Sequence, residues 1–161
     1  MMYKGLHGAF SDDEIIYVDI RKGAFPLDRW ERKPIIVEPT VVADLKRLPF
    51  KDGCFNLILF DPPHGNFSLD TFMGVKYGGL TETEFTYLIV WANREFWRVL
   101  KPGGVVFAKV MDNNNRYKRL LRAFVAFKPL LDIDFESKGH HALEWNRTHW
   151  ILFVRRDDYV P

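Results

Sequence analysis

The chain has 161 residues, with 23 Lys and Arg against 21 Asp and Glu, a formal net charge of +2, and 47% hydrophobic residues. The length predicts one domain over residues 1–161, and the composition excludes an intrinsically disordered chain. The near-neutral charge excludes a strong field directed at nucleic acid or membrane, although basic residues gathered on one face would still favour polyanions. The single cysteine, Cys54, excludes an internal disulfide or a cysteine-rich zinc site and favours a reducing, cytoplasmic setting. No apolar run reaches the roughly 20 residues that span a bilayer, so we expect no membrane partner.

Three short apolar runs in the first part of the chain each carry an aspartate at or near their end. Residues 14–20, 40–44 and 55–60 are predicted strands, with Asp19, Asp44 and Asp61 at their carboxyl ends. These runs are nearly continuous in apolar residues, which is typical of a parallel sheet covered by helices on both faces. Residues 21–39 contain three prolines and are predicted to be mostly loop.

The second half of the chain alternates between helix and strand signals. Thr81 and Glu84 form a capping-box pattern ahead of a helical spacing of apolar residues, which ends at residues 101–104, Lys-Pro-Gly-Gly. Residues 105–110, 130–135 and 149–154 are further predicted strands. A second amphipathic helix over residues 117–125 carries Lys118, Arg119 and Arg122 on its predicted solvent side. Together the elements predict an α/β fold with a mostly parallel, twisted sheet.

The carboxyl ends of parallel strands meet at one edge of a sheet, where ligands bind in such folds. Asp19, Asp44 and Asp61 are therefore predicted to share a site. Each also has a simpler interpretation. Asp19 could cap the loop that follows it, Asp44 could pair with Lys46 or Arg47, and Asp61 could begin an ordinary loop.

Several short motifs resemble those of class I, Rossmann-like S-adenosylmethionine-dependent methyltransferases, in the same order along the chain. They include the segment from Asp44 to the Leu-Pro-Phe string at residues 48–50, the string Asp61-Pro62-Pro63-His64, and the segment from Trp97 to Gly104. The chain looks most similar to small phage- and prophage-associated members, which share the Asp-Pro-Pro-His string. Those members also share a Lys-Tyr-Gly string, here residues 76–78, and a last strand that opens with Thr-His-Trp, here residues 148–150.

The resemblance implies a Rossmann-like methyltransferase fold with an antiparallel last strand, but one feature of the family is missing. The family opens with a strand and a glycine-rich turn that hold the methionine end of the cofactor, and Gly5 and Gly8 follow no such strand. We expect either that the native reading frame begins upstream of Met1 or that the chain is a shortened relative. A gap in the sheet would then be filled by rearrangement or by another subunit.

The resemblance also implies roles for particular residues. The Asp61 carboxylate and the Pro62 carbonyl would accept the two hydrogens of an amino group on a nucleic-acid base, with Pro63 stiffening the loop. His64 would stack on the base or accept a proton. For the cofactor, S-adenosylmethionine, Asp19 would bind the ribose hydroxyls, Asp44 and Leu45 would flank the adenine, and Asp61 would lie beside the methyl group.

These implications predict a methyltransferase that acts on nucleic acid, with DNA favoured over RNA. Target specificity would come from residues 65–80, from a partner protein or from a homo-oligomer. Two alternatives stay open: a non-catalytic scaffold that kept the fold, and a methyltransferase acting on a small molecule or a protein. No metal site is predicted, since His140 and His141 lack companion ligands and are expected in a solvated loop.

Overall fold

The structure is a computed structural model that describes residues 15–27, 32–63, 65–68, 70–138 and 145–160. His64, His140 and His141 lie outside these residues. Its largest sheet has the strand order β5-β6-β8-β7, formed by β5 (Phe55–Phe60), β6 (Leu100–Met111), β8 (Trp145–Arg155) and β7 (Phe127–Lys138). Strands β5 and β6 are parallel, and β8 is antiparallel to both β6 and β7. Three of the four strands therefore run in one direction, and the last strand in the chain is the antiparallel one, as expected.

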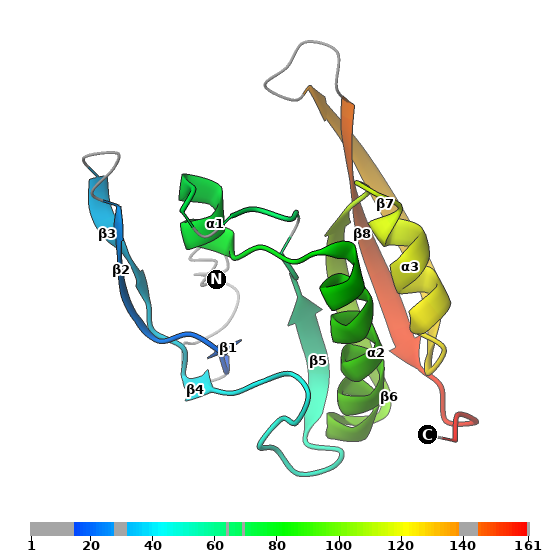
Figure 1. The fold of residues 1–161 in the computed structure, drawn as a ribbon. Coiled ribbons are helices and arrows are strands. Elements are labelled where there is room, and N and C mark those ends of the chain that lie inside the picture. The colour runs from blue at the N-terminus through cyan, green and yellow to red at the C-terminus, as the bar shows by residue number, and fades with distance from the viewer. Residues whose placement is uncertain (1–14, 28–31, 64, 69, 139–144, 161) are drawn as a thin grey trace.

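Two helices, α2 (Glu82–Val99) and α3 (Arg116–Ala123), pack against this sheet and contact each other (Figure 1). The capping box predicted at Thr81 is present and starts α2. Its apolar face is buried, and side chains of β6 and β8 that point toward the helices complete the core. The fully buried members of this core include Phe85, Ile89, Val99, Val106, Ala108, Leu120 and Ile151.

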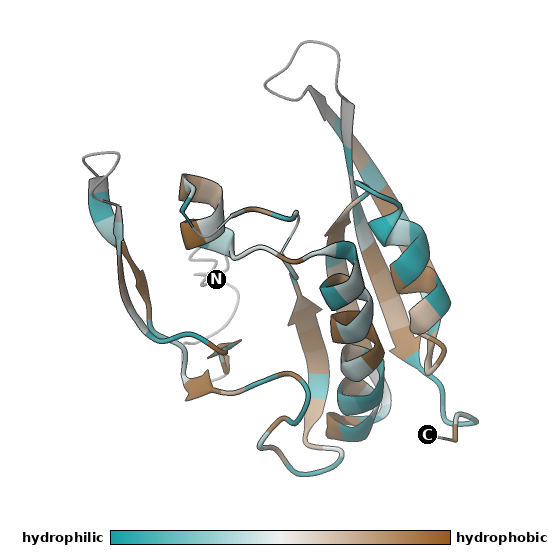
Figure 2. Cartoon of the chain, in the orientation of Figure 1, coloured by the Kyte–Doolittle hydropathy of each residue, from teal (hydrophilic) through white to brown (hydrophobic). Residues whose placement is uncertain are grey.

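The prediction that helices cover both faces of the sheet is not met within the described part of the chain. Both α2 and α3 lie on the same side of the sheet in Figure 1. Side chains alternate between faces along a strand, so the opposite face carries Leu57, Leu59, Leu131 and Ile133, which are all exposed. Strands β5 and β8 are coloured mostly apolar in Figure 2 because they carry apolar side chains on both faces of the sheet. The apolar strands that predicted a sheet covered on both faces are therefore covered on one face only, within the described residues.

The segment before β5 forms two small sheets. Strand β1 (Val18–Asp19) pairs in parallel with β4 (Val41–Val42), and β2 (Gly23–Leu27) pairs with β3 (Arg32–Val37) as an antiparallel hairpin. The prediction of loop over residues 21–39 is therefore wrong. Proline is compatible with a two-stranded sheet because each strand has an outer edge that needs no amide donor, and the register also shifts beside Pro26.

The free edge of β5 is the place where the fold differs from a continuous sheet. Figure 1 shows the β1–β4 pair on the side of β5 away from β6, and no strand within the described residues pairs with that edge. The expectation that the first strand and glycine-rich turn of the family pattern are missing concerns residues 1–14, which lie outside the described residues. The short helix α1 (Phe72–Tyr77) follows β5 and was not predicted. None of the helices described is long and apolar enough to cross a membrane.

Candidate functional site

The first candidate residue, Asp61, lies directly after the last residue of β5. The neighbouring residue across the parallel pair is Lys109, whose Nζ is 3.7 Å from Asp61 Oδ2. The Asp61 side chain is 28% exposed and the Lys109 side chain 17%. Lys109 also lies over the ring of Trp150, 5.6 Å from its centroid. The Asp61 carboxylate is therefore half-buried and faces a fixed cation at the carboxyl end of the sheet.

The loop that follows Asp61 is packed against the Lys-Tyr-Gly segment. A Cβ placed on Gly78 would meet Pro63 Cγ at 3.7 Å, and Gly78 itself has a φ of 74°, which favours glycine. A Cβ on Gly79 would lie 2.0 Å from the Phe67 carbonyl oxygen. Pro63 of one resemblance motif therefore lies beside Gly78 of another, where the positive φ favours glycine, and the close approach of the Phe67 backbone requires glycine at position 79.

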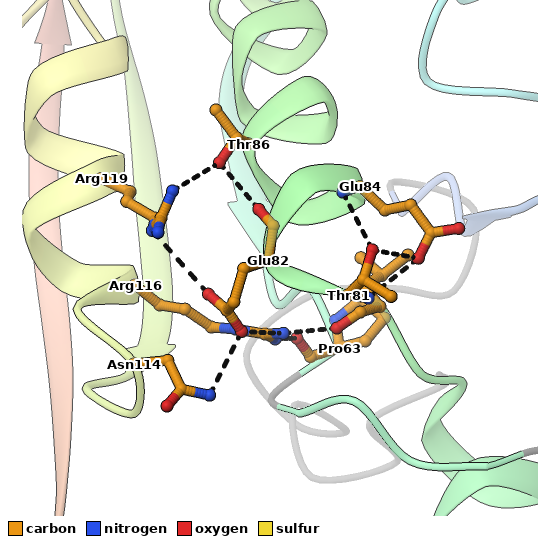
Figure 3. A network of polar contacts seen from close by, with 9 residues as sticks. Pro63, Thr81, Glu82, Glu84, Thr86, Asn114, Arg116 and Arg119 are labelled. Carbon is orange, nitrogen blue, oxygen red and sulfur yellow. Dashed lines mark hydrogen bonds and ion pairs between the residues drawn. The ribbon is translucent and has the colours of Figure 1, made fainter.

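The Pro63 carbonyl is held by Arg116, the first residue of α3 (Figure 3). The Arg116 side chain is 0% exposed. Its Nη1 donates to the Pro63 carbonyl at 2.7 Å and its Nη2 to the Leu80 carbonyl at 2.5 Å. Its Nε and Nη2 also donate to Glu82 Oε1, at 3.0 and 2.9 Å, and its guanidinium lies 4.6 Å from the ring centroid of Phe85. One buried cation therefore joins the loop after β5 to the start of both helices.

Arg119, one turn further along α3, supports the same contact between helices. It donates to Thr86 Oγ1 at 3.1 Å and its Nε lies 3.8 Å from Glu82 Oε2 (Figure 3). The prediction that Arg119 lies on the solvent side of α3 is therefore wrong in part, since its side chain is 41% exposed but bridges to α2. Unlike Arg116, it makes no hydrogen bond to the loop after β5 among the described residues.

Asp19 lies at the end of β1, as predicted, and binds Arg21. Arg21 donates its backbone N–H and its Nε to Asp19 Oδ1, and its Nη2 to Oδ2 at 3.2 Å. Burial raises the pKa of the Asp19 carboxyl, but the hydrogen bonds from Arg21 outweigh it and lower the pKa overall. Arg21 Nη1 also donates to the Val75 carbonyl in α1. The Asp19 carboxylate is thus an ionised acceptor that already has one cationic partner.

Asp44 follows β4 and closes a turn. Its Oδ1 accepts the Lys46 backbone N–H at 2.9 Å, and its Oδ2 lies 3.9 Å from Lys46 Nζ. This is the simpler interpretation given above for Asp44, a turn with a solvated ion pair. The neighbouring Leu45 is half-buried and packs against the core cluster. Asp44 and Asp19 lie at the same ends of two paired strands, because β1 and β4 are parallel.

The Thr-His-Trp string was expected to open the last strand, but it lies inside β8, three residues after the strand begins at Trp145, and its side chains lie on both faces of the sheet. His149 is stacked on Tyr117, with ring centroids 3.8 Å apart, and its Nδ1 is 3.1 Å from Asp132 Oδ1. Tyr117 donates its hydroxyl to Asp132 Oδ2 at 2.6 Å, which raises the pKa of Tyr117 to about 12. Trp150 lies on the opposite face, beneath Lys109. The string therefore fixes α3 and the partner of Asp61 at once.

The structure brings Asp61, Pro62 and Pro63 together at the end of β5, and it pairs β1, which ends at Asp19, with β4, which ends two residues before Asp44. His64 lies outside the described residues, so its role stays a prediction. The sequence analysis missed Lys109 and Arg116. A lysine inside an apolar strand, and an arginine at the start of a helix beside an aromatic-rich core, were the available signals. No cluster of metal-ligating side chains occurs among the described residues.

Comparison with known proteins gives similarity at the level of solved structures. No family model matches the chain, and no curated protein matches it. One similar structure is TrmN from Thermus thermophilus, at 20% identity and a TM-score of 0.48, covering 72% of this chain and 28% of that one.

Two further similar structures are methyltransferases by name. Geranyl diphosphate C-methyltransferase from Streptomyces coelicolor A3(2), in complex with S-adenosyl-L-homocysteine, is 13% identical with a TM-score of 0.46, covering 72% of this chain and 54% of that one. The N-methyltransferase NodS from Bradyrhizobium japonicum WM9 is 13% identical with a TM-score of 0.42, covering 73% and 54%. The chain spans from about a quarter to about half the length of these three proteins, and at these scores the similarity assigns it no activity.

Proposed function

We propose that this chain is an S-adenosylmethionine-dependent methyltransferase that acts on an amino group of a nucleic-acid base, with DNA favoured over RNA. The observation that carries the proposal is the fixed geometry after β5. There the Asp61 carboxylate lies at the carboxyl end of a strand, and the next two residues are prolines whose second carbonyl is held by a buried arginine. Such rigidity suits a reaction in which positioning of the reactants supplies much of the rate.

The carboxylates at the ends of β1 and β4 fit the polar parts of the cofactor. A carboxylate has about four lone-pair sites, so Asp19 can accept ribose hydroxyls while it still binds Arg21. Asp44 is 45% exposed and can accept from the exocyclic amine of an adenine. Leu45 would supply the apolar contact beside the ring. The described residues contain no strand with a glycine-rich turn beside β5, so the site for the methionine end stays unassigned.

In the proposed reaction, S-adenosylmethionine supplies an electrophilic methyl group when it is bound. The lone pair of a base amino group is delocalised into the ring, which makes the nitrogen a poor nucleophile. Hydrogen bonds from the amino group to the Asp61 carboxylate and the Pro62 carbonyl would localise that pair. Bound S-adenosylmethionine would supply the methyl group that the nitrogen accepts, with the sulfur as the leaving group, and the released proton would pass to Asp61 or, through His64, to solvent.

The ion pair of Asp61 with Lys109 defines the resting state of this site. Lys109 holds the carboxylate in place until the amino group arrives to share it. At a separation of 3.7 Å the pair is loose enough for the carboxylate to reorient toward a substrate. A base in a duplex would have to be flipped out of the stack to reach Asp61, at a cost of a few kcal/mol. A single strand avoids that cost.

The test has two stages. Calorimetry with S-adenosylmethionine, and with its demethylated product, measures whether the chain binds the cofactor. Transfer of a labelled methyl group to DNA, RNA and protein pools then identifies the acceptor. Binding followed by labelling of nucleic acid supports the proposal, whereas labelling of protein alone would overturn the assignment of the acceptor.

A non-catalytic, methyltransferase-like scaffold is the second candidate. The observation that favours it is that both carboxylates expected to bind the cofactor already have partners from their own turns, Arg21 for Asp19 and Lys46 for Asp44. The calorimetry separates the two candidates, because a scaffold predicts no heat of binding at millimolar cofactor.

A further inference from the structure

A second site of a different character lies at the other end of β5. A pocket of about 520 Å³ opens between the second half of α2 and the loop 46–51, which leads into β5. This volume falls within the range of ligand pockets, roughly 300–1,000 Å³. Because Asp61 follows the last residue of β5 and the pocket borders the loop before its first residue, the pocket is separate from the candidate site described above.

The lining of this pocket is strongly basic for a chain with a net charge of +2. It contains five cationic side chains and a single carboxylate: Lys46, Arg47, Lys51, Arg94, Arg98 and Glu95. Trp91, Pro49 and Phe50 add an apolar wall, and Trp91 is only half-buried. The combination of cations and an accessible indole is the composition of a surface that binds phosphates and stacks a base.

One of the cations builds the pocket rather than serving a ligand. Arg98 donates to both carboxylate oxygens of Glu95 and to Asp52 Oδ1, at 2.8–3.0 Å. It also donates to the carbonyls of Leu48 and Phe50, which fixes the loop against α2. Glu95 in turn accepts the Leu48 backbone N–H. The single carboxylate of the lining is therefore fully engaged with the pocket wall.

Three of the remaining cations have no such partner. No carboxylate among the described residues lies within ion-pair distance, 4.0 Å, of Arg47, Lys51 or Arg94, and Lys46 lies at 3.9 Å from Asp44. All three side chains are exposed. They converge on one pocket from two elements, the loop and the helix. Five cations against the carboxylates of Glu95, Asp52 and Asp44 leave a local charge of about +2 at this concave surface. A positive charge concentrated in this way attracts a polyanion more than the same net charge spread over the whole chain.

We propose that this pocket binds the phosphodiester backbone of a single-stranded nucleic acid, with phosphates on Arg47, Lys51 and Arg94 and a base against Trp91. The choice of nucleic acid over another polyanion rests on the proposed function, which it deepens by giving the substrate strand an anchor. β5 is six residues long, so the anchor and Asp61 lie roughly 20 Å apart. A strand of several nucleotides that bound the pocket would reach the reaction site.

The test measures binding of fluorescently labelled single-stranded DNA and RNA of about 16 nucleotides by anisotropy, across a series of salt concentrations. A triple variant, Arg47→Ala with Lys51→Ala and Arg94→Ala, should bind at least about tenfold more weakly, and its log–log salt slope should fall by about 2. The matched control removes three exposed cations elsewhere, Lys118, Arg122 and Lys128, and should change affinity and slope much less. Trp91→Leu should weaken binding about fivefold or more without altering the salt slope. Thermal melting checks that each variant is folded.

Equal losses in the two triple variants would overturn the proposal, since the effect would then be one of net charge. Absence of oligonucleotide binding by the wild-type chain would also overturn it, as would binding of polyglutamate with the same dependence on Arg47, Lys51 and Arg94. Failure of the pocket proposal and failure of the proposed enzyme function give different experimental results. Oligonucleotide binding through the pocket without any methyl transfer would refute the enzyme alone, and methyl transfer to an oligonucleotide with an unchanged KM in the pocket variant would refute the anchor alone.

Discussion

Substitution of Arg116 by alanine tests the contact that joins the loop after β5 to both helices. The substitution removes a fully buried guanidinium and leaves the carbonyls of Pro63 and Leu80 without their donor. Breaking a buried ion pair from one side costs about 3–5 kcal/mol. The loss of unfolding free energy is reduced because Glu82 is 28% exposed and keeps Arg119 at 3.8 Å. The same loss is increased because two carbonyls are left without a donor. We therefore expect a loss of about 3–5 kcal/mol.

For a chain of this size each kcal/mol lowers Tm by about 2–4 °C, so Arg116→Ala should melt about 6–20 °C below the wild type in calorimetry or circular dichroism. Arg119→Ala is the matched control, because Arg119 binds the same Glu82 but not the loop. It should lose only about 0.5–1.5 kcal/mol. Arg116→Lys keeps the charge but not the forked geometry, and should recover part of the loss. Equal Tm values for the Arg116→Ala and Arg119→Ala variants would show that the hydrogen bonds of Arg116 to the loop after β5 do not stabilise the fold.

The remaining predictions concern other contacts of the fold. Gly79→Ala should cost about 1–3 kcal/mol in urea denaturation, because the new Cβ would lie 2.0 Å from the Phe67 carbonyl oxygen, and a neutral result would mean that the loop shifts freely. Thr81→Ala should cost about 0.5–2 kcal/mol through loss of the capping box, and an unchanged midpoint would contradict that role. Burial raises the pKa of Glu95, but its hydrogen bonds with Arg98 outweigh this and lower the pKa overall. Its stabilising contribution is therefore complete above the unfolded pKa of about 4.3 and is lost as pH falls through the folded value. The difference in unfolding free energy between wild type and Glu95→Gln should shrink below pH 4. A difference that grows there would mean that the pKa of Glu95 is raised, not lowered, in the folded state.

The elements that are marked by short sequence motifs could be predicted from the sequence alone. The capping box at Thr81 and the helical spacing after it predicted α2. Asp19 and Asp61 marked the ends of β1 and β5 correctly, whereas β4 ends at Val42, two residues before Asp44. The hairpin of β2 and β3 was missed because Pro26 and Pro34 indicate loop unless a strand has a free edge, and that property belongs to the sheet. The uncovered face of the main sheet was missed for a similar reason. Apolar residues at both faces of a strand do not reveal which face is covered.

The candidate site also contains residues that the sequence predicted and residues that only the folded structure reveals. Asp61, Pro62 and Pro63 form a contiguous motif and were found in the sequence. Their partners Lys109 and Arg116 come from elements 48 and 53 residues away, and only the packing of β6 and α3 against β5 brings them to the loop. The pocket beneath α2 was missed because its cations are distributed over a loop and a helix, where each resembles an ordinary solvated residue.

Asp61→Ala shows whether Asp61 carries methyl transfer. Labelled-methyl transfer to a single-stranded oligonucleotide is measured beside calorimetric affinity for S-adenosylmethionine, with Asp158→Asn as a control at an exposed carboxylate. Turnover should fall at least about a hundredfold in Asp61→Ala while cofactor affinity changes little, and the control should keep full activity. Near-wild-type turnover in Asp61→Ala would show that Asp61 does not carry methyl transfer.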